Sequence, residues 1–445
     1  MDTPVVAPTE TYGEINEQIS DDVLKRPRHW GWLFGFGCAF GLLSVLMASL
    51  FWLFFRGVGI WGINIPVAWG FAIVNYVWWI EIAQGGTFIS AVLLLFHQSW
   101  RTSVNRMTES VTLFALACAG LFPLLHLGRP QYAFFLLPYP NTLGLWPQFI
   151  SPLVWDVFAV MVYGSISIVL WYLGLLPDLA TLRDRARPKY LRRFYSILSF
   201  GWRNSARHWH HYETTYKVIA ALAVPLVISV HSIVGLDFAY TIVPGWHSTI
   251  FPPAFVVGAI FAGFAMVLTL VIPIRAIYRL RKVITADHLD KMAKMLLTMG
   301  MFVLLGKLSD FFMAWYSGDL YEQYHAADEV IGNYSSAFWI ATACNATVIQ
   351  FLWLKKVRSS PIALFGIAFL VNIGMWAERY LNIVGSLHRD YLPSSWGLFQ
   401  ATFWDWSTYV GTIGLFLTLL FLFLRFLPIV SMSEMRGFIH KENRP

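Results

Sequence analysis

The feature that most constrains this chain is a series of long apolar stretches that recurs along its whole length. Hydrophobic residues make up 57% of the 445 residues and charged residues only 13%, too little charge for the surface of a soluble protein. A hydrocarbon layer of ~30 Å requires about 20 apolar residues of helix to cross it. The sequence therefore predicts an all-α integral membrane protein with about ten transmembrane helices. We expect these helices at approximately residues 30–55, 66–95, 109–127, 151–175, 214–236, 253–277, 293–316, 335–355, 361–384 and 404–427.

Basic residues gather in alternate loops and predict the topology. Lys25 and Arg26 precede the first span, Arg101 and Arg106 follow the second, and further clusters of Lys and Arg follow the fourth, sixth and eighth. The positive-inside rule places these loops in the cytoplasm, together with tails at residues 1–29 and 428–445. The net charge of +7 therefore reflects topology in a lipid bilayer and does not indicate nucleic-acid binding.

The cysteines limit the cofactors that we expect. Cys38, Cys118 and Cys344 each lie in a separate apolar segment. They cannot supply the four thiolates of an iron–sulfur cluster, and no Cys-x-x-Cys-His haem attachment motif occurs. We expect no haem, iron–sulfur cluster or metal in this chain.

A short internal similarity indicates a duplicated core. The segments SIVGLDFAYTIVPGW (232–246) and NIVGSLHRDYLPSSW (382–396) each end a helix that runs outward in the predicted topology. This predicts two parallel repeats at residues 66–236 and 253–384, each a four-helix bundle, flanked by the helices at 30–55 and 404–427. A chance match is the alternative.

Three predicted helices carry ionisable residues to a similar depth near the outer membrane face. His126 ends the third span, Asp156 lies about a turn and a half into the fourth, and His231 and Asp237 lie toward the outer end of the fifth. A charged side chain near the bilayer centre costs ~2.5–3.5 kcal/mol, so its presence requires a reason. Any one of these residues alone is more readily structural. Their shared depth favours a catalytic, quinol-binding site at His126, Asp156 and Asp237, since quinol oxidation releases two protons.

A second set of ionisable residues lies in other predicted helices. Lys307 and Asp310 are three residues apart and can pair on one helix face, whereas the adjacent Glu378 and Arg379 are expected to point apart. A buried structural network and a proton route fit these residues equally well. The candidates for a proton route are Glu81, Glu213, His231, Lys307, Asp310, Glu378, Arg379 and Asp405, and Glu81 and Arg129 are further candidates for quinol binding.

Long runs of this sequence resemble a known family. HQSWRTSVNRMTESVTLFALACAGLFPLLHLGRPQYAFFLLPYPNTLGLWPQFISPLVWDVFAV, GWRNSARHWHHYETTY and FMAWYSGDLYE are similar to the larger quinol-binding membrane subunit of bacterial alternative complex III, in the NrfD and polysulfide-reductase membrane-anchor group. The resemblance implies two four-helix bundles flanked by two helices, with menaquinol oxidised near the periplasmic side at His126, Asp156 and Asp237. One departure is Ala83-Gln84-Gly85-Gly86-Thr87, where the family pattern is Gly-His-Ala-Gly-Thr and where the two glycines indicate close helix packing.

The resemblance also implies partners and a location. The chain would be a subunit of a quinol oxidoreductase in a respiratory or photosynthetic chain of the bacterial cytoplasmic membrane, with possible proton translocation, and not an enzyme alone. Electrons would pass to a periplasmic iron–sulfur subunit and to multihaem and monohaem cytochrome c subunits. A second homologous ten-helix membrane subunit and smaller membrane subunits would complete the complex.

Two other functions remain open from the residues themselves. A haem b-binding quinol subunit would need two histidines at matched depth, and His126 and His231 are the outer candidates. A secondary transporter could use the charged network, although Gly/Pro interruptions at corresponding places of the two repeats are missing from the sequence.

Overall fold

The computed structural model describes residues 12–25, 30–137 and 150–435 of the chain. Within these ranges the chain is nearly all helical and contains no strand, which confirms the predicted all-α class. The predicted tails fall partly outside the described residues, at residues 1–11, 26–29 and 436–445.

Nine helices in the described part are long and apolar enough to cross a membrane. They are α2 (Trp30–Arg56), α3 (Phe71–Leu95), α4 (Asn105–Ala119) with α5 (Phe122–Leu125), α6 (Pro152–Arg185), α8 (Ala206–Ala239), α9 (Phe251–Ile277), α10 (Ala286–Tyr316), α14 (Pro361–Tyr380) continued by η8 (Leu381–Gly385), and α15 (Phe403–Phe426). The short helix α1 (Tyr12–Leu24) precedes them. Shorter helices lie between them: α7 (Lys189–Leu198), α11 (Leu320–Ile331), α13 (Lys355–Arg358) and the 3₁₀ segments η1 (Val58–Ile60), η2 (Ser99–Ser103), η3 (Pro130–Leu136), η5 (Leu280–Lys282) and η9 (Pro393–Ser395).

The span expected at 335–355 is not a continuous α-helix. It consists of α12 (Ser335–Thr342), the π-helical segment η6 (Ala343–Thr347) and the 3₁₀ segment η7 (Val348–Trp353). In the part of the chain that the structure describes, nine long apolar helices and this interrupted segment agree with the prediction of about ten transmembrane helices.

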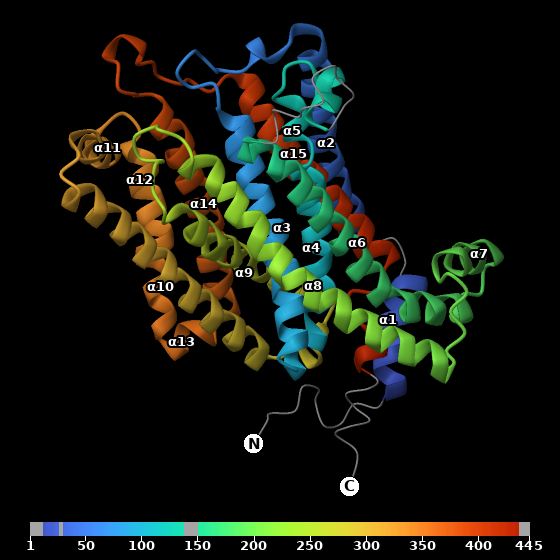
Figure 1. The fold of residues 1–445 in the computed structure, drawn as a ribbon. Coiled ribbons are helices and arrows are strands. Elements are labelled where there is room, and N and C mark those ends of the chain that lie inside the picture. The colour runs from blue at the N-terminus through green and yellow to red at the C-terminus, as the bar shows by residue number, and fades with distance from the viewer. Residues whose placement is uncertain (1–11, 26–29, 138–149, 436–445) are drawn as a thin grey trace.

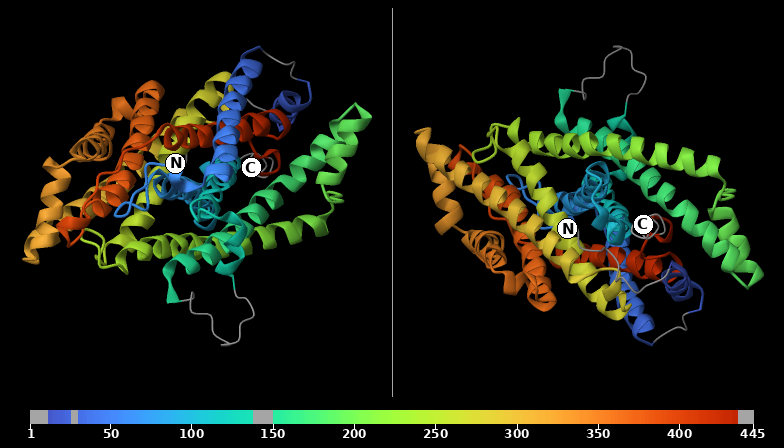
Figure 2. Two further views of the ribbon diagram at one scale, coloured as in Figure 1. Left: turned by 90° about the horizontal axis from the view of Figure 1, so that it is seen from above. Right: turned by 90° about the horizontal axis from the view of Figure 1, so that it is seen from below.

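Eight helical segments pack as two groups of four with the same cyclic order. In the first bundle α3 packs against α4, α4 against α6, α6 against α8 and α8 against α3. In the second bundle α9 packs against α10, α10 against η6 and η7, α12 against α14 and α14 against α9. The two bundles meet along α3 and α9, while α2 and α15 pack against each other beside the first (Figure 1 and Figure 2).

The contact between α3 and α9 depends on glycine. A Cβ atom on Gly85 would lie 2.4 Å from the Cα atom of Gly263, and one on Gly86 would lie 2.4 Å from the Thr108 carbonyl oxygen of α4. Small residues allow helix backbones to approach closely in a membrane. The adjacent glycines of α3 thus place this helix against α9 on one side and α4 on the other.

Candidate functional site

A cavity of about 350 Å³ lies within the first bundle, near the ends of α6 and α8 that face the α4–α5 junction. His126, Asp156 and Asp237 all line it, so the structure brings the three outer residues around one space. The rest of its wall is mainly apolar and is formed by Trp69, Ile73, Tyr76, Val77, Gly120, Pro123, Leu124, Leu127, Leu153, Val157, Val160, Met161, Val234 and Phe238.

The short helix α5 sets the position of His126. α4 ends at Ala119, and the chain becomes helical again as α5, with Pro123 in its first turn. The missing N–H of proline costs nothing there, because the first N–H groups of a helix have no intrahelical partner. His126 follows α5, and its Nδ1 lies 3.1 Å from the carbonyl oxygen of Phe122. Since a carbonyl can only accept, Nδ1 carries the proton and the Nε2 lone pair of the neutral ring remains an acceptor.

Asp156 is held by a tyrosine that the sequence pattern does not single out. The Tyr76 hydroxyl of α3 donates a hydrogen bond to Asp156 Oδ2. The other carboxylate oxygen, Asp156 Oδ1, and Oδ1 of Asp237 are buried and have no hydrogen-bond partner among the described residues. An unsatisfied buried acceptor costs about 1–3 kcal/mol. The two carboxylates are therefore suited to a ligand that brings hydroxyl donors.

The other quinol-binding candidates lie away from this cavity. Arg129 is exposed and is absent from the described lining residues. Glu81 lies on α3 but faces the second bundle, where its Oε1 is 2.8 Å from Nε of Arg379 on α14. His231, a candidate for the proton route and not for quinol binding, is fully buried on α8, and neither ring nitrogen has a hydrogen-bond partner in the described part of the chain.

Arg379 joins two carboxylates between the bundles. Besides Glu81, its Nη2 lies 3.2 Å from Oε1 of the adjacent Glu378. The expectation that Glu378 and Arg379 point apart is therefore wrong, because the long side chains reach each other even though their Cα positions diverge. Gly258 of α9 leaves room for this group, since a Cβ there would lie 2.9 Å from Arg379 Nη2.

Lys307 has a closer partner than the predicted one. Its Nζ lies 3.8 Å from Asp310 Oδ2 but 2.7 Å from Oε2 of Glu329 on α11. Burial alone would raise the pKa of Glu329, but Lys307 and His325 outweigh it and hold this pKa at about 2. The ion pair of Lys307 with Glu329 thus joins this end of α10 to α11.

Comparison with known proteins assigns the family. Residues 61–389 match the family described as "Polysulphide reductase, NrfD". The chain belongs to this family.

Two relatives of this NrfD-family chain are named as components of reductases. It is 28% identical over 250 residues to the membrane C-subunit of a putative dimethyl sulfoxide reductase of Halobacterium salinarum, covering 54% of this chain and 50% of that protein. It is 22% identical over 388 residues to the C-subunit of selenate reductase of Mesobacillus selenatarsenatis, covering 82% and 87%. The matched region thus spans half of the first relative and most of the second.

The remaining proton-route candidates of the NrfD-family chain take separate places. Asp405 Oδ2 accepts from the backbone N–H of Thr402 at 2.8 Å and of Gly62 at 2.8 Å, so Asp405 caps α15 and fastens a loop. Glu213 is exposed near the start of α8. Among the described residues, no group of three or more His, Cys, Asp or Glu side chains could hold a metal ion.

Proposed function

We propose that this chain is the quinol-binding membrane subunit of an oxidoreductase complex, and that quinol is oxidised in the cavity of the first bundle. The observation that supports this function is that His126 and two carboxylates, each with an unpaired oxygen among the described residues, line one mainly apolar cavity of about 350 Å³. A quinol carries two hydroxyl groups on an apolar ring with an apolar tail. The polar residues of the cavity can bind the hydroxyl groups, and its apolar wall can hold the ring and the tail.

The residues can take the two protons that quinol oxidation releases. His126 Nε2 accepts one hydroxyl proton and becomes imidazolium, and Asp156 Oδ1 accepts the other. Asp237 then receives protons from this pair and passes them outward. Tyr76 holds Asp156 Oδ2, so that Oδ1 stays directed at the ligand. The two electrons leave for a partner protein of the complex.

The specific complex is a finer part of the same proposal. The sequence resemblance favours alternative complex III, with menaquinol as substrate and with cytochrome c subunits, a periplasmic iron–sulfur subunit and a second homologous membrane subunit as partners. The names of the two relatives favour a reductase of a small oxidised substrate instead. Either complex would take its electrons from quinol. Covalently bound haem c in the purified complex would support the first, and its absence the second.

Proton translocation through the second bundle belongs to this proposal as well. The ion pairs connect Glu81 through Arg379 to Glu378, and Lys307 and Glu329 continue toward the surface. His231, Asp310, Asp405 and Glu213 stay candidates, although Asp405 also has the capping role described above.

The test is turnover of the intact complex with His126→Ala. General acid–base groups contribute about 10²–10⁴-fold, so quinol-dependent reduction of the acceptor should fall by at least 10²-fold, with weaker binding of a quinol analogue. Arg129→Ala is the matched control, because Arg129 is three residues away and does not line the cavity in the described structure. Unchanged turnover in a His126→Ala complex that keeps its normal set of subunits would contradict the proposed site.

A further inference from the structure

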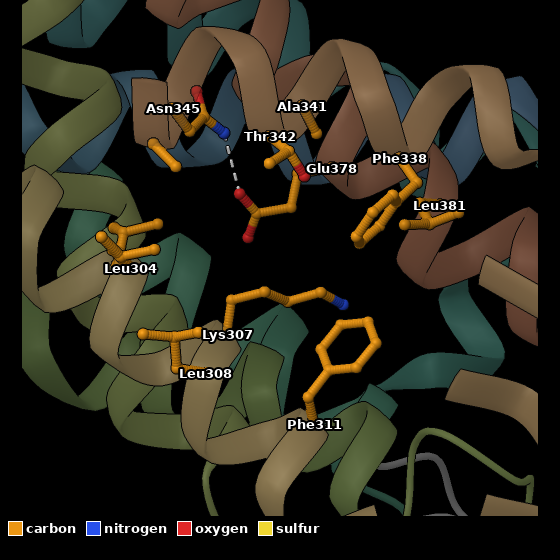
Figure 3. Close-up of a pocket in the computed structure, with 12 residues that line it drawn as sticks. Leu304, Lys307, Leu308, Phe311, Phe338, Ala341, Thr342, Asn345, Glu378 and Leu381 are labelled. Carbon is orange, nitrogen blue, oxygen red and sulfur yellow. Dashed lines mark hydrogen bonds between the residues drawn. The ribbon is translucent and has the colours of Figure 1, made fainter. Parts of the chain in front are cut away.

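We propose that the second bundle holds a second binding site for a quinone ring, in a cavity beside Lys307 and Glu378. This goes beyond the proposed function, in which quinol binds only in the cavity of the first bundle. The second cavity measures about 240 Å³ and lies between α10, α12 with η6, and α14 with η8. Figure 3 shows Lys307 and Glu378 facing each other across it.

The two cavities occupy corresponding places in the two bundles. The first lies between α3, the α4–α5 segment, α6 and α8. In the cyclic order of the second bundle, α9, α10, the interrupted helix and α14 take those positions. Helices α10, α12 and α14 line the second cavity, and a smaller space of about 50 Å³ that shares Val303, Lys307 and Glu378 extends it to α9. A ligand pocket in one repeat therefore has a structural counterpart in the other.

The helices around this cavity are distorted where they line it. The described residues contain two π-helical segments, η6 and η8, and both contribute to the wall, through Asn345, Ala346 and Leu381. A π-helical turn is rare and occurs frequently at functional sites. Within the described part of the first bundle the helices carry no such segment. Packing between apolar helices does not require two π-helical segments at one place. A ligand site can require them, because they turn Asn345 and Leu381 toward the cavity.

The polar groups match a neutral ring that has both acceptor and donor forms. Lys307 Nζ has three donors, of which Glu329 takes one at 2.7 Å, while Asp310 at 3.8 Å is too far for a hydrogen bond. Asn345 Nδ2 donates to Glu378 Oε2 at 2.9 Å and so orients that carboxylate. A quinone carbonyl can accept from Lys307, and the hydroxyl of its reduced form can donate to Glu378. An anionic lipid headgroup would be repelled by Glu378, and an acyl chain would bind neither the remaining Lys307 donors nor the Glu378 carboxylate.

The walls of the second cavity fit the ring and the apolar tail of a quinone. Phe311 and Phe338 lie with ring centroids 5.7 Å apart and tilted by 57°, so they offer aromatic surface to a flat ring. Leu308 lines the cavity and is 59% exposed. The cavity therefore opens beside Leu308 on the outer side of the bundle, where an apolar tail can extend along the lipid-facing surface of α10.

The experiment is photolabelling of the intact complex with an azido-naphthoquinone, followed by peptide mapping. We expect label on residues 303–311 and 338–346 as well as on the peptides of the first cavity. Ala341→Phe places a ring in the second cavity and should reduce photolabelling of that cavity at least tenfold, while photolabelling of the first cavity is retained. Ile340→Phe is the matched control, because Ile340 is exposed on the same helix and does not line the cavity.

A second variant keeps the test decisive if Ala341→Phe does not assemble. Lys307→Gln removes the charged donor and should weaken labelling of residues 303–311 about tenfold, since a hydrogen bond from a charged group is lost. Labelling that is confined to the first cavity in the wild type would overturn the second site, as would labelling that excess unlabelled menaquinone does not displace. The same peptides labelled in preference by a diacyl phospholipid probe would also overturn it. Retention of the second label in the His126→Ala complex separates this inference from the function of the first cavity.

Discussion

At the scale of single residues, the sequence predicts how deep a residue lies along its helix but not in which direction its side chain points. His126, Asp156 and Asp237 belong to three helices, yet their positions along those helices place them around one cavity. Glu81 and Tyr76 show the limit. They lie five residues apart on α3, about 140° around the helix, so Tyr76 faces the first bundle and Glu81 the second. Without a helical phase fixed by a neighbour, the sequence could not show that Tyr76 and not Glu81 lines the cavity.

Tyr76→Phe tests the positioning of Asp156. The change keeps the ring but removes the hydroxyl that donates to Asp156 Oδ2, so the carboxylate is free to turn away from the quinol. We expect kcat/KM for quinol to fall about tenfold, the value of one hydrogen bond to a charged group. The pH–rate profile of kcat/KM should shift as well, which a merely structural role would not cause. Tyr172→Phe is the control, since its hydroxyl donates to the Leu198 carbonyl oxygen at 2.6 Å, away from the cavity lining. Equal loss in both variants would argue against a positioning role.

At the scale of elements, hydropathy predicts where helices cross the membrane but not how they are wound. The eighth expected span is apolar like the others, yet Ala343–Thr347 is π-helical and the following residues are 3₁₀. Hydropathy depends only on composition within a window, and no residue type in this run signals the change of hydrogen-bond register. The glycines of α3 were more informative, because Gly85 and Gly86 predicted close packing and both lie at helix contacts.

Gly85→Ala tests whether this close approach stabilises the junction of the two bundles. The new Cβ would lie 2.4 Å from Gly263 Cα and 2.7 Å from the Ala259 carbonyl oxygen, both backbone atoms that cannot rotate away. We expect a loss of about 1–3 kcal/mol, the usual cost of overpacking, seen as a lower midpoint of thermal unfolding in detergent. Gly41→Ala on α2 has nothing within 4 Å of its Cβ and should be neutral or slightly stabilising. A Gly85→Ala protein as stable as the Gly41→Ala protein would show that the helices can separate at little cost.

At the scale of the whole molecule, residues from distant parts of the sequence close the first bundle at the end remote from His126. Asp178 of α6 pairs with Arg106 of α4 at 3.0 Å and accepts from the backbone N–H of Ser433 at 2.9 Å. Arg101 lies 2.6 Å from Glu434. Arg101 and Arg106 are read from the sequence as topological charges, but their side chains are buried in these pairs. Their partners could not be predicted, because Asp178 and Ser433 are separated by 255 residues of chain.

Asp178→Ala tests this closure. Removal of the carboxylate leaves the buried Arg106 guanidinium without its ion-pair partner and the Ser433 N–H without its acceptor, and breaking a buried pair in this way costs about 3–5 kcal/mol. Because the backbone N–H of Ser433 loses its acceptor, residues 429–435 should also loosen, with the Arg101–Glu434 pair left as a contact of this segment, and faster proteolysis there in the folded complex measures the change. Asp184→Ala is the matched control: Asp184 pairs with Arg183 on the same helix, but its side chain is 66% exposed, so we expect a change within about 1 kcal/mol. Faster proteolysis with unchanged global stability would mean that Asp178 fastens only the C-terminal segment. Faster proteolysis together with lower global stability would show that this segment helps to hold α4 and α6 together.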